Sequence, residues 1–295
     1  WLDLLADSLF DEQRKRAVST RGGVVLRDPG AAGPVSLAEG SLWVATRGRT
    51  RRFRNVEGVV VPRGGEVAVL VEAESPGAPW NVGPGELVEI LSPGGTGLVV
   101  SNPARASASW ITQQGADTET DEALRQRCRD KWATVGSGST EAAYRYWATS
   151  SSAEVTRTRV TADPATGVVT VRVAGPSGPV SAGALAAVRT RLARQRPLTV
   201  SALAEDVGVE VVPIEGVLYV EGADNTDAAA EASERLRAYA RASGIGEVVY
   251  KARLVAELMA VRGVRNVVLT RPAGDVVVAA DRIFVPAPSL VTEAA

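Results

Sequence analysis

The sequence predicts an α+β chain built from several subdomains, and three features support this prediction. Between residues 22 and 110, short valine-rich runs alternate with Gly and Pro at intervals of about ten residues, which is typical of an antiparallel sandwich or barrel. At Asp117 the apolar spacing changes from every second residue to i, i+4, which indicates helices. From residue 153 onward, strand and helix patterns alternate, which is typical of small two-layer α/β units.

The first predicted segment, residues 1–20, holds an amphipathic helix expected over residues 2–18. Its apolar stripe consists of Leu2, Leu5, Leu9 and Phe10. Two alternatives are open for this stripe: the helix packs on the domain that follows, or it joins a bundle with partner chains. Because the chain begins with Trp1 and not with Met, we expect it to start inside a longer or processed product.

The second predicted segment, residues 21–116, is β-rich. Strands are expected around residues 56–61, 67–71 and 86–91. The middle strand shows the clearest alternation, because its valines occupy every second position and face one side of a sheet.

The third predicted segment, residues 117–152, is a helical connector. An acidic stretch precedes a helix near residues 119–133, and Thr118 and Asp121 fit a capping box at its start. A break at residues 136–138 separates this helix from a second one over residues 140–149. The expected packing residues are Leu124, Cys128 and Trp132 on the first helix, and Ala143, Tyr146 and Trp147 on the second.

The last two predicted segments, residues 153–221 and 222–295, combine strands and helices. The first is expected to hold a hairpin (154–161 and 168–173), a helix (181–195) that Pro197 ends, and two strands (198–203 and 207–212). The second is expected to hold helices at 226–242 and 251–261, strands at 264–270 and 276–280, and a loose tail over 287–295.

The composition lowers the expectation of an enzyme. The chain has no His, which removes the Ser-His-Asp and Cys-His constellations and the commonest metal ligand. Cys128 is its single cysteine, so an intrachain disulfide is excluded. The net charge of -1 gives no overall field that would recruit nucleic acid or an acidic membrane. No apolar run reaches the roughly 18 residues that a membrane span needs.

Three residue clusters could carry chemistry, but a structural interpretation is favoured for each of them. The glycines at 94–97 lack the Gly-Lys-Ser/Thr ending of a phosphate-binding loop, and those at 136–139 are interpreted as a linker between helices, although anion capture there is conceivable. The acids at 117–122 lack the spacing of a calcium loop and are interpreted as helix-capping residues.

Aromatic and basic residues supply further interface candidates. Trp80 and Trp110 lie in turn-rich sequence and are therefore expected to be exposed, where they would serve a protein contact or a ligand equally well. A basic run includes Arg47, Arg49 and Arg51; it is either a solvated loop or a docking site for an acidic partner surface.

The run from Val67 to Trp147 resembles the baseplate J-like family. The matching elements are residues 69–77 (VLVEAESPG), 81–87 (NVGPGEL), 97–98 (GL), 100–103 (VSNP) and 115–127 (GADTETDEALRQR), followed by Gly138, Tyr144, Trp147 and Ala148. Their order and spacing together are more specific than any one of them. Trp80 and the stretch 110–114 depart from the family pattern, which often has small residues there.

The resemblance implies a structural wedge subunit of a contractile phage tail, a tailocin or a contractile injection system. In such particles several copies surround a central tube and spike, two copies usually join a third, different subunit, and the wedges link into a sixfold ring. The implied partners are other wedge subunits, copies of this chain, and hub, spike or sheath proteins, in a particle assembled in the bacterial cytoplasm. No catalytic residue, cofactor, metal, nucleic acid or small-molecule substrate is implied.

One alternative of a different class remains open at this stage. It is a carbohydrate-binding or carboxylate-dependent glycan-processing β domain with an α/β appendage. It would require Trp80 and Trp110 to be exposed in one groove beside paired carboxylates.

Overall fold

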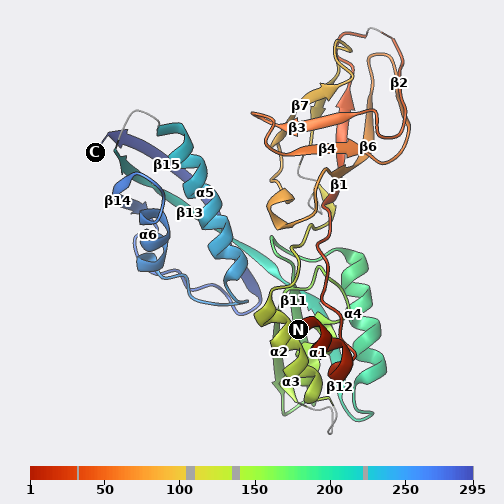
Figure 1. Cartoon of the computed structure of the whole chain (residues 1–295), viewed down its shortest axis with the longest axis vertical. Coiled ribbons are helices and arrows are strands. Elements are labelled where there is room, and N and C mark those ends of the chain that lie inside the picture. The colour runs from red at the N-terminus through yellow and green to blue at the C-terminus, as the bar shows by residue number, and fades with distance from the viewer. Residues whose placement is uncertain (32, 104–109, 135–139, 222–224, 295) are drawn as a thin grey trace. The chain divides into compact units, whose positions relative to one another are not determined.

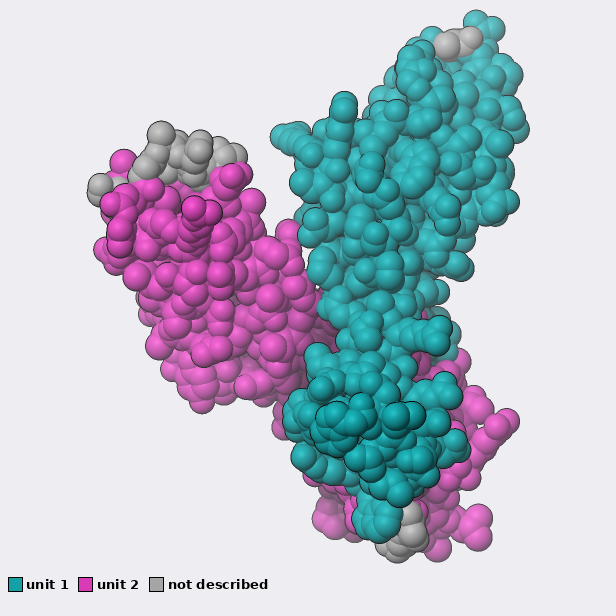
Figure 2. Space-filling view, in the orientation of Figure 1, with its two compact units in different colours: residues 1–132, 181–184 teal, residues 133–180, 185–295 magenta. Residues whose placement is uncertain are grey.

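The structure, a computed structural model, describes residues 1–31, 33–103, 110–134, 140–221 and 225–294. The chain divides into two compact units, residues 1–132 with 181–184, and residues 133–180 with 185–295, which Figure 2 shows in different colours. Among the described residues no helix is long and apolar enough to cross a membrane. The glycine-rich stretch 136–139, considered above for anion capture, lies outside the described residues.

The β-rich part of the first unit is a nearly closed barrel (Figure 1). Its strands are β1 (Arg21–Arg27), β3 (Trp43–Thr46), β4 (Arg52–Asn55), β6 (Glu66–Ala73), β7 (Leu87–Ser92), β8 (Val99–Ser101) and β9 (Ile111–Gln113). They follow the order β7-β3-β4-β6-β1-β8, with β9 also on β1, and all pairs are antiparallel. Because β7 also contacts β8, the two ends of the sheet meet. A short sheet of β2 (Val35–Leu37) and β5 (Val59–Val61) and a 3-10 turn, η1 (Ala78–Trp80), complete this part.

The barrel interior follows the alternation that the sequence shows. On β6, Val69, Val71 and Ala73 are buried while Glu66 and Ala68 are exposed, which confirms the strand predicted there. The predicted exposure of Trp110 is wrong, because its side chain is 0% exposed. Its ring packs edge-on against Phe53 with centroids 5.7 Å apart.

The helical part of the first unit consists of α1 (Leu2–Phe10) and α2 (Asp121–Trp132). The predicted helix over 2–18 ends eight residues early, because Asp11 adopts a left-handed conformation (φ 49°) and closes the helix through backbone bonds to Ala6 and Asp7. The predicted capping box is also wrong in detail. Thr120, and not Thr118, caps α2, since its Oγ1 accepts a hydrogen bond from the Ala123 amide at 3.2 Å.

The second unit begins with α3 (Glu141–Thr149) and a small α/β layer. Thr140 caps α3, and Ala143, Tyr146 and Trp147 are buried, as predicted. The predicted hairpin is confirmed as β10 (Arg157–Asp163) and β11 (Val168–Ala174), and β12 (Ser201–Asp206) lies parallel to β11. Helix α4 (Ala182–Gln195), whose first residues belong to the first unit, connects β11 to β12 and buries Val188 and Leu192.

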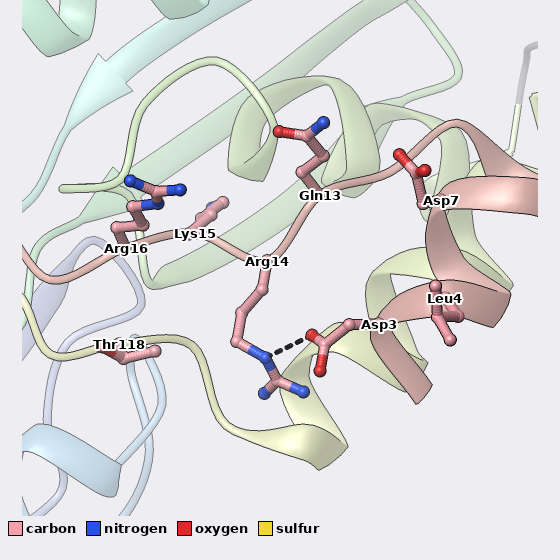
Figure 3. A pocket seen from close by; sticks show the side chains of 8 residues that line it. All are labelled: Asp3, Leu4, Asp7, Gln13, Arg14, Lys15, Arg16 and Thr118. Carbon is pink, nitrogen blue, oxygen red and sulfur yellow. Dashed lines mark hydrogen bonds and ion pairs between the residues drawn. The ribbon is translucent and has the colours of Figure 1, made fainter. Parts of the chain in front are cut away.

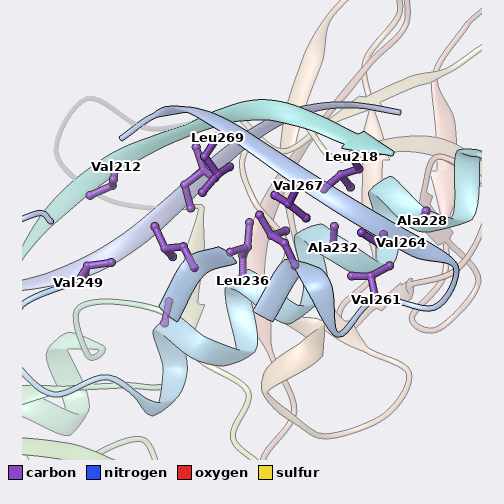
Figure 4. Packing of buried hydrophobic residues seen from close by; sticks show 14 of the residues in the cluster. Val212, Leu218, Ala228, Ala232, Leu236, Val249, Val261, Val264, Val267 and Leu269 are labelled. Atoms are coloured by element: carbon purple, nitrogen blue, oxygen red, sulfur yellow. The ribbon is translucent and has the colours of Figure 1, made fainter. Parts of the chain in front are cut away.

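The C-terminal sheet of the second unit has the order β14-β13-β15. Its strands are β13 (Gly208–Val220), β14 (Val264–Arg271), antiparallel to it, and β15 (Arg282–Ala294), parallel to it. Helices α5 (Asn225–Ala242) and α6 (Lys251–Met259) pack on one face of this sheet. Figure 4 shows the buried side chains between them, among them Leu218, Leu236 and Leu269.

Two predictions for the end of the chain are wrong. The stretch 276–280 is not a strand, since Val276 forms only an isolated bridge with Val249. The predicted loose tail belongs instead to β15, in which Pro286 and Pro288 pair in register with β13. Prolines are tolerated in an edge strand because they need not donate to a further strand, so they are compatible with β15. The α+β class is confirmed, while the five-segment division stays a prediction.

Candidate docking site at the N-terminal helix

Helix α1 has two apolar faces. Leu2, Ala6 and Phe10 follow i, i+4 spacing and pack on Leu124 and Cys128 of α2. The second face, called the outer face here, consists of Trp1, Leu4, Leu5 and Leu9, which are 79%, 75%, 38% and 66% exposed. The predicted four-residue stripe is therefore divided, with Leu2 and Phe10 turned to the chain's own core and Leu5 and Leu9 turned to solvent.

Trp132 extends the exposed apolar surface at the end of α2. The sequence predicted a packing role for it, but its side chain is 68% exposed because it follows the last buried turn of α2. It still contacts α1, since its ring meets that of Phe10 edge-on at a centroid distance of 6.0 Å.

A buried group of charges holds α1 and the residues after it to α2. We call Glu12, Glu119, Arg127 and Lys131 the ionic clamp. The Arg127 guanidinium, whose side chain is 5% exposed, donates to both Glu119 oxygens at 2.8 and 2.7 Å and forms an ion pair with Glu12. Such a bidentate arrangement is the strong form of an arginine–carboxylate contact.

Lys131 joins the clamp to the end of α1. Its ammonium group lies 2.9 Å from a Glu12 oxygen, and it donates to the backbone carbonyls of Phe10 and, at 3.3 Å, Asp11. A cation at the last carbonyls of a helix satisfies acceptors that the helix itself leaves open and favours the negative end of its dipole.

Arg14 adds a second link beside the clamp. It donates to Asp3 and Asp121 and to the Glu119 carbonyl, each at 2.7 Å. This contact also explains part of the acidic stretch at 117–122, whose carboxylates cap backbone groups or pair with arginines. Among the described residues no group of acids, His and Cys is placed to hold a metal ion.

Burial and charge act in opposite directions on the carboxylate at the clamp. Burial raises the pKa of Glu119, but the hydrogen bond from Arg127 and that from the Lys15 amide outweigh it and leave the pKa below its usual value. Burial lowers the pKa of Lys15 to about 8. For Cys128, burial raises the pKa of the thiol, which keeps it protonated as a small apolar side chain.

An open cleft of about 480 Å³ lies next to the outer face (Figure 3). Leu4 belongs to both, and the opposite wall comes from the segment after α1 and from Thr118. Asp3 is held there by Arg14, and that hydrogen bond lowers the pKa of the carboxyl group. The cleft therefore places a polar border, with Asp3 and Arg14 paired, beside Leu4 of the outer face.

The other interface candidates lie on the barrel. Arg47 and Arg49 are exposed, and Arg49 forms an ion pair with Glu89 at 3.2 Å. Arg51 and Trp80 are brought together, since the guanidinium lies 5.8 Å from the ring centroid and donates to the Pro79 carbonyl at 2.9 Å.

Trp110 is buried and is therefore not available for contact with a partner or a ligand. Its indole Nε1 donates to the Val82 carbonyl at 2.8 Å inside the barrel. The glycan-binding alternative needed Trp80 and Trp110 in one exposed groove, and the burial of Trp110 contradicts that arrangement.

Sequence reasoning missed Trp1, Leu4 and Trp132 as exposed apolar residues. A usable signal was present for α1, since Trp1, Leu5 and Leu9 recur at i, i+4, i+8 and define a face different from that of Leu2, Ala6 and Phe10. For Trp132 no local signal existed, because its exposure depends on where α2 ends.

Comparison with known proteins finds a family match for the barrel. Residues 24–109 match the family model described as the Baseplate J-like protein barrel domain. No curated protein matches the chain. Among solved structures, the chain is similar to one in the cryo-EM structure of the anti-feeding prophage (AFP) baseplate, 6-fold symmetrised, with 14% sequence identity and a TM-score of 0.43 over 96% of this chain and 79% of that chain. Residues 24–109 are thus similar to the baseplate J-like barrel domain, which confirms the family resemblance found in the sequence.

Proposed function

We propose that this chain is a structural subunit of the baseplate of a contractile tail or injection machine. The observation that carries the proposal is the match of residues 24–109 to the baseplate J-like barrel domain. In its finer form, the chain is a wedge protein that links wedges into a ring around the tube and spike, in a particle assembled in the bacterial cytoplasm. It assigns no catalytic, cofactor or metal role to any residue.

The outer face of α1 supplies a contact that such a subunit needs. Trp1, Leu4, Leu5 and Leu9 leave large apolar side chains in water on one short helix. Burying each is worth roughly 1.5–3 kcal/mol as an upper estimate, which offsets part of the entropy lost on association. In our proposal this face enters an intermolecular bundle with another baseplate subunit, and the barrel residues Arg47, Arg49, Arg51 and Trp80 are secondary contact candidates.

The test places charges on the outer face. Leu5→Asp with Leu9→Asp should leave the circular dichroism spectrum unchanged, because both side chains are exposed, yet abolish co-purification with the other baseplate proteins of the particle. The matched control is Val60→Asp with Val99→Asp, which introduces the same two charges at exposed barrel positions. Normal assembly of the α1 variant, or equal loss in the control, would count against the proposed docking role.

A further inference from the structure

The contacts of α1 raise the question of what keeps it folded. It has nine residues, and isolated helices shorter than about 12–15 residues are marginal in water. Among the residues that the structure describes, no side chain caps its first turn. Within it only Ala6 is fully buried, with Leu2 and Phe10 partly buried against Leu124 and Cys128. Intrinsic propensity and apolar packing are therefore both small for this helix.

The polar contacts are more extensive. Arg14 donates to Asp3 in the first turn, and the other contacts lie at the C-terminal end of α1. Lys131 binds the last carbonyls of α1, and Arg127 binds Glu12 and the Gln13 carbonyl (2.8 Å) directly after it. Two bonds between Lys15 and Glu119 continue the attachment. The Glu119 amide donates to the Lys15 carbonyl at 3.0 Å, and the Lys15 amide donates to a Glu119 side-chain oxygen at 3.2 Å. The side chains of Glu12 and Glu119, the acidic partners of Arg127, are also buried, at 9% and 7% exposure.

We infer that α1 is a conditional helix: the ionic clamp centred on Arg127, and not apolar packing, keeps it folded and presents its outer face. Removal of one member of a buried charge group leaves an uncompensated charge, so the clamp opens as a unit. Once residues 10–15 are released from α2, the carbonyl groups at the C-terminal end of the nine-residue helix lose their hydrogen bonds from Lys131, and the helix unfolds. Arg127 is thus a positioning residue for the outer face. The helix–clamp coupling stands on these contacts alone, and only its consequence for docking rests on the proposed function.

Hydrogen exchange on the full chain tests this coupling. The helical amides from Leu5 to Asp11 and the Glu12 amide report on α1, and the β6 amides paired with β1 report on the barrel. Arg127→Met should accelerate exchange in α1 by at least about 100-fold while β6 stays protected. The matched control, Arg129→Met on the same helix, removes an exposed contact to Glu122 at 3.3 Å and should leave α1 unchanged.

Unchanged α1 protection in Arg127→Met would overturn the inference. If the Arg127→Met variant also loses β6 protection, the milder variant Glu12→Gln tests the inference instead. Faster exchange confined to residues 5–12 in that variant supports the role of the ionic clamp, and protection equal to wild type refutes it. Co-purification separates this inference from the proposed function. The Leu5/Leu9 double variant should keep the α1 amides protected but not dock, whereas Arg127→Met should lose both the protection of α1 and docking. Normal docking of the leucine variant would contradict only the docking proposal.

Discussion

The burial of Trp110 leads to a quantitative prediction for the barrel. Its side chain is fully buried, packs edge-on against Phe53 at 5.7 Å and donates to the Val82 carbonyl at 2.8 Å. Trp110→Ala removes the ring and the hydrogen bond together, and replacement of a buried large aromatic by Ala costs about 3–5 kcal/mol. Trp110→Phe keeps most of the ring but leaves the Val82 carbonyl without its donor, which costs about 1–3 kcal/mol.

Gly22 is the partner that tests the geometry of this site. A Cβ at this position would clash with the Trp110 ring and lie 2.7 Å from the Trp110 carbonyl oxygen. Gly22→Ala should therefore destabilise the barrel by about 1–3 kcal/mol through overpacking. In the Trp110→Ala background the ring clash disappears and only the backbone clash remains, so the two costs should be less than additive.

The assay is native-state hydrogen exchange at the amides that pair β1 with β6, because it reports the opening free energy of the barrel separately from the second unit. Six tryptophans make total fluorescence a poor probe of this one site. An opening free energy for Trp110→Ala within about 0.5 kcal/mol of wild type would refute the core assignment, since surface substitutions fall in that range. Strict additivity of the Gly22 and Trp110 costs would refute the close approach of the Gly22 backbone to the Trp110 ring.

Two further predictions concern buried polar groups. Arg157 donates to the carbonyls of Ala240 (2.9 Å) and Gly175 (2.5 Å), and burial lowers its pKa to about 10; Arg157→Met should speed hydrogen exchange at the end of α5, while the exposed control Arg194→Met should not. The pKa of Glu119 is lowered in the folded chain, so its ionised carboxylate stabilises α1 at pH values above the unfolded pKa of about 4.3, and this stabilisation is lost as the pH falls through the folded pKa. Protection of the α1 amides should therefore persist at neutral pH and decrease below about pH 4. In Glu119→Gln this protection should depend less on pH.

Much of the fold was predictable where local pattern and tertiary packing agree. On β6 the alternation of valines matches the barrel interior, and at α3 the Thr140 cap and its buried aromatic residues follow the sequence signal directly. The hairpin of β10 and β11 was likewise predictable, because its turn residues and flanking strands occur together in the chain.

The end of α1 and the exposure of Trp132 could not be predicted from a short stretch of sequence. Glu12, Gln13 and Lys15 are good helix formers, so the pattern extended α1 past its real end. Their actual conformation is set by residues more than 100 positions away in the sequence. Arg127 and Lys131 contact Glu12 and Gln13, and Glu119 bonds to Lys15. The exposure of Trp132 depends on where α2 ends, which the local pattern does not show. The candidate docking site was thus predictable as an apolar helix but not as a helix with two faces.

The distribution of residues on α1 bears on its role. In a helix that serves only its own core, the largest apolar residues face inward and polar residues face water. Here Ala6 is the fully buried apolar residue, whereas Trp1, Leu4 and Leu9 are mostly exposed. The inward attachment relies on buried charges instead, which leaves the large apolar side chains free for another surface. Exposed apolar patches of this kind mark interaction sites in soluble proteins, and this supports a docking role for α1 independently of the match to the barrel domain.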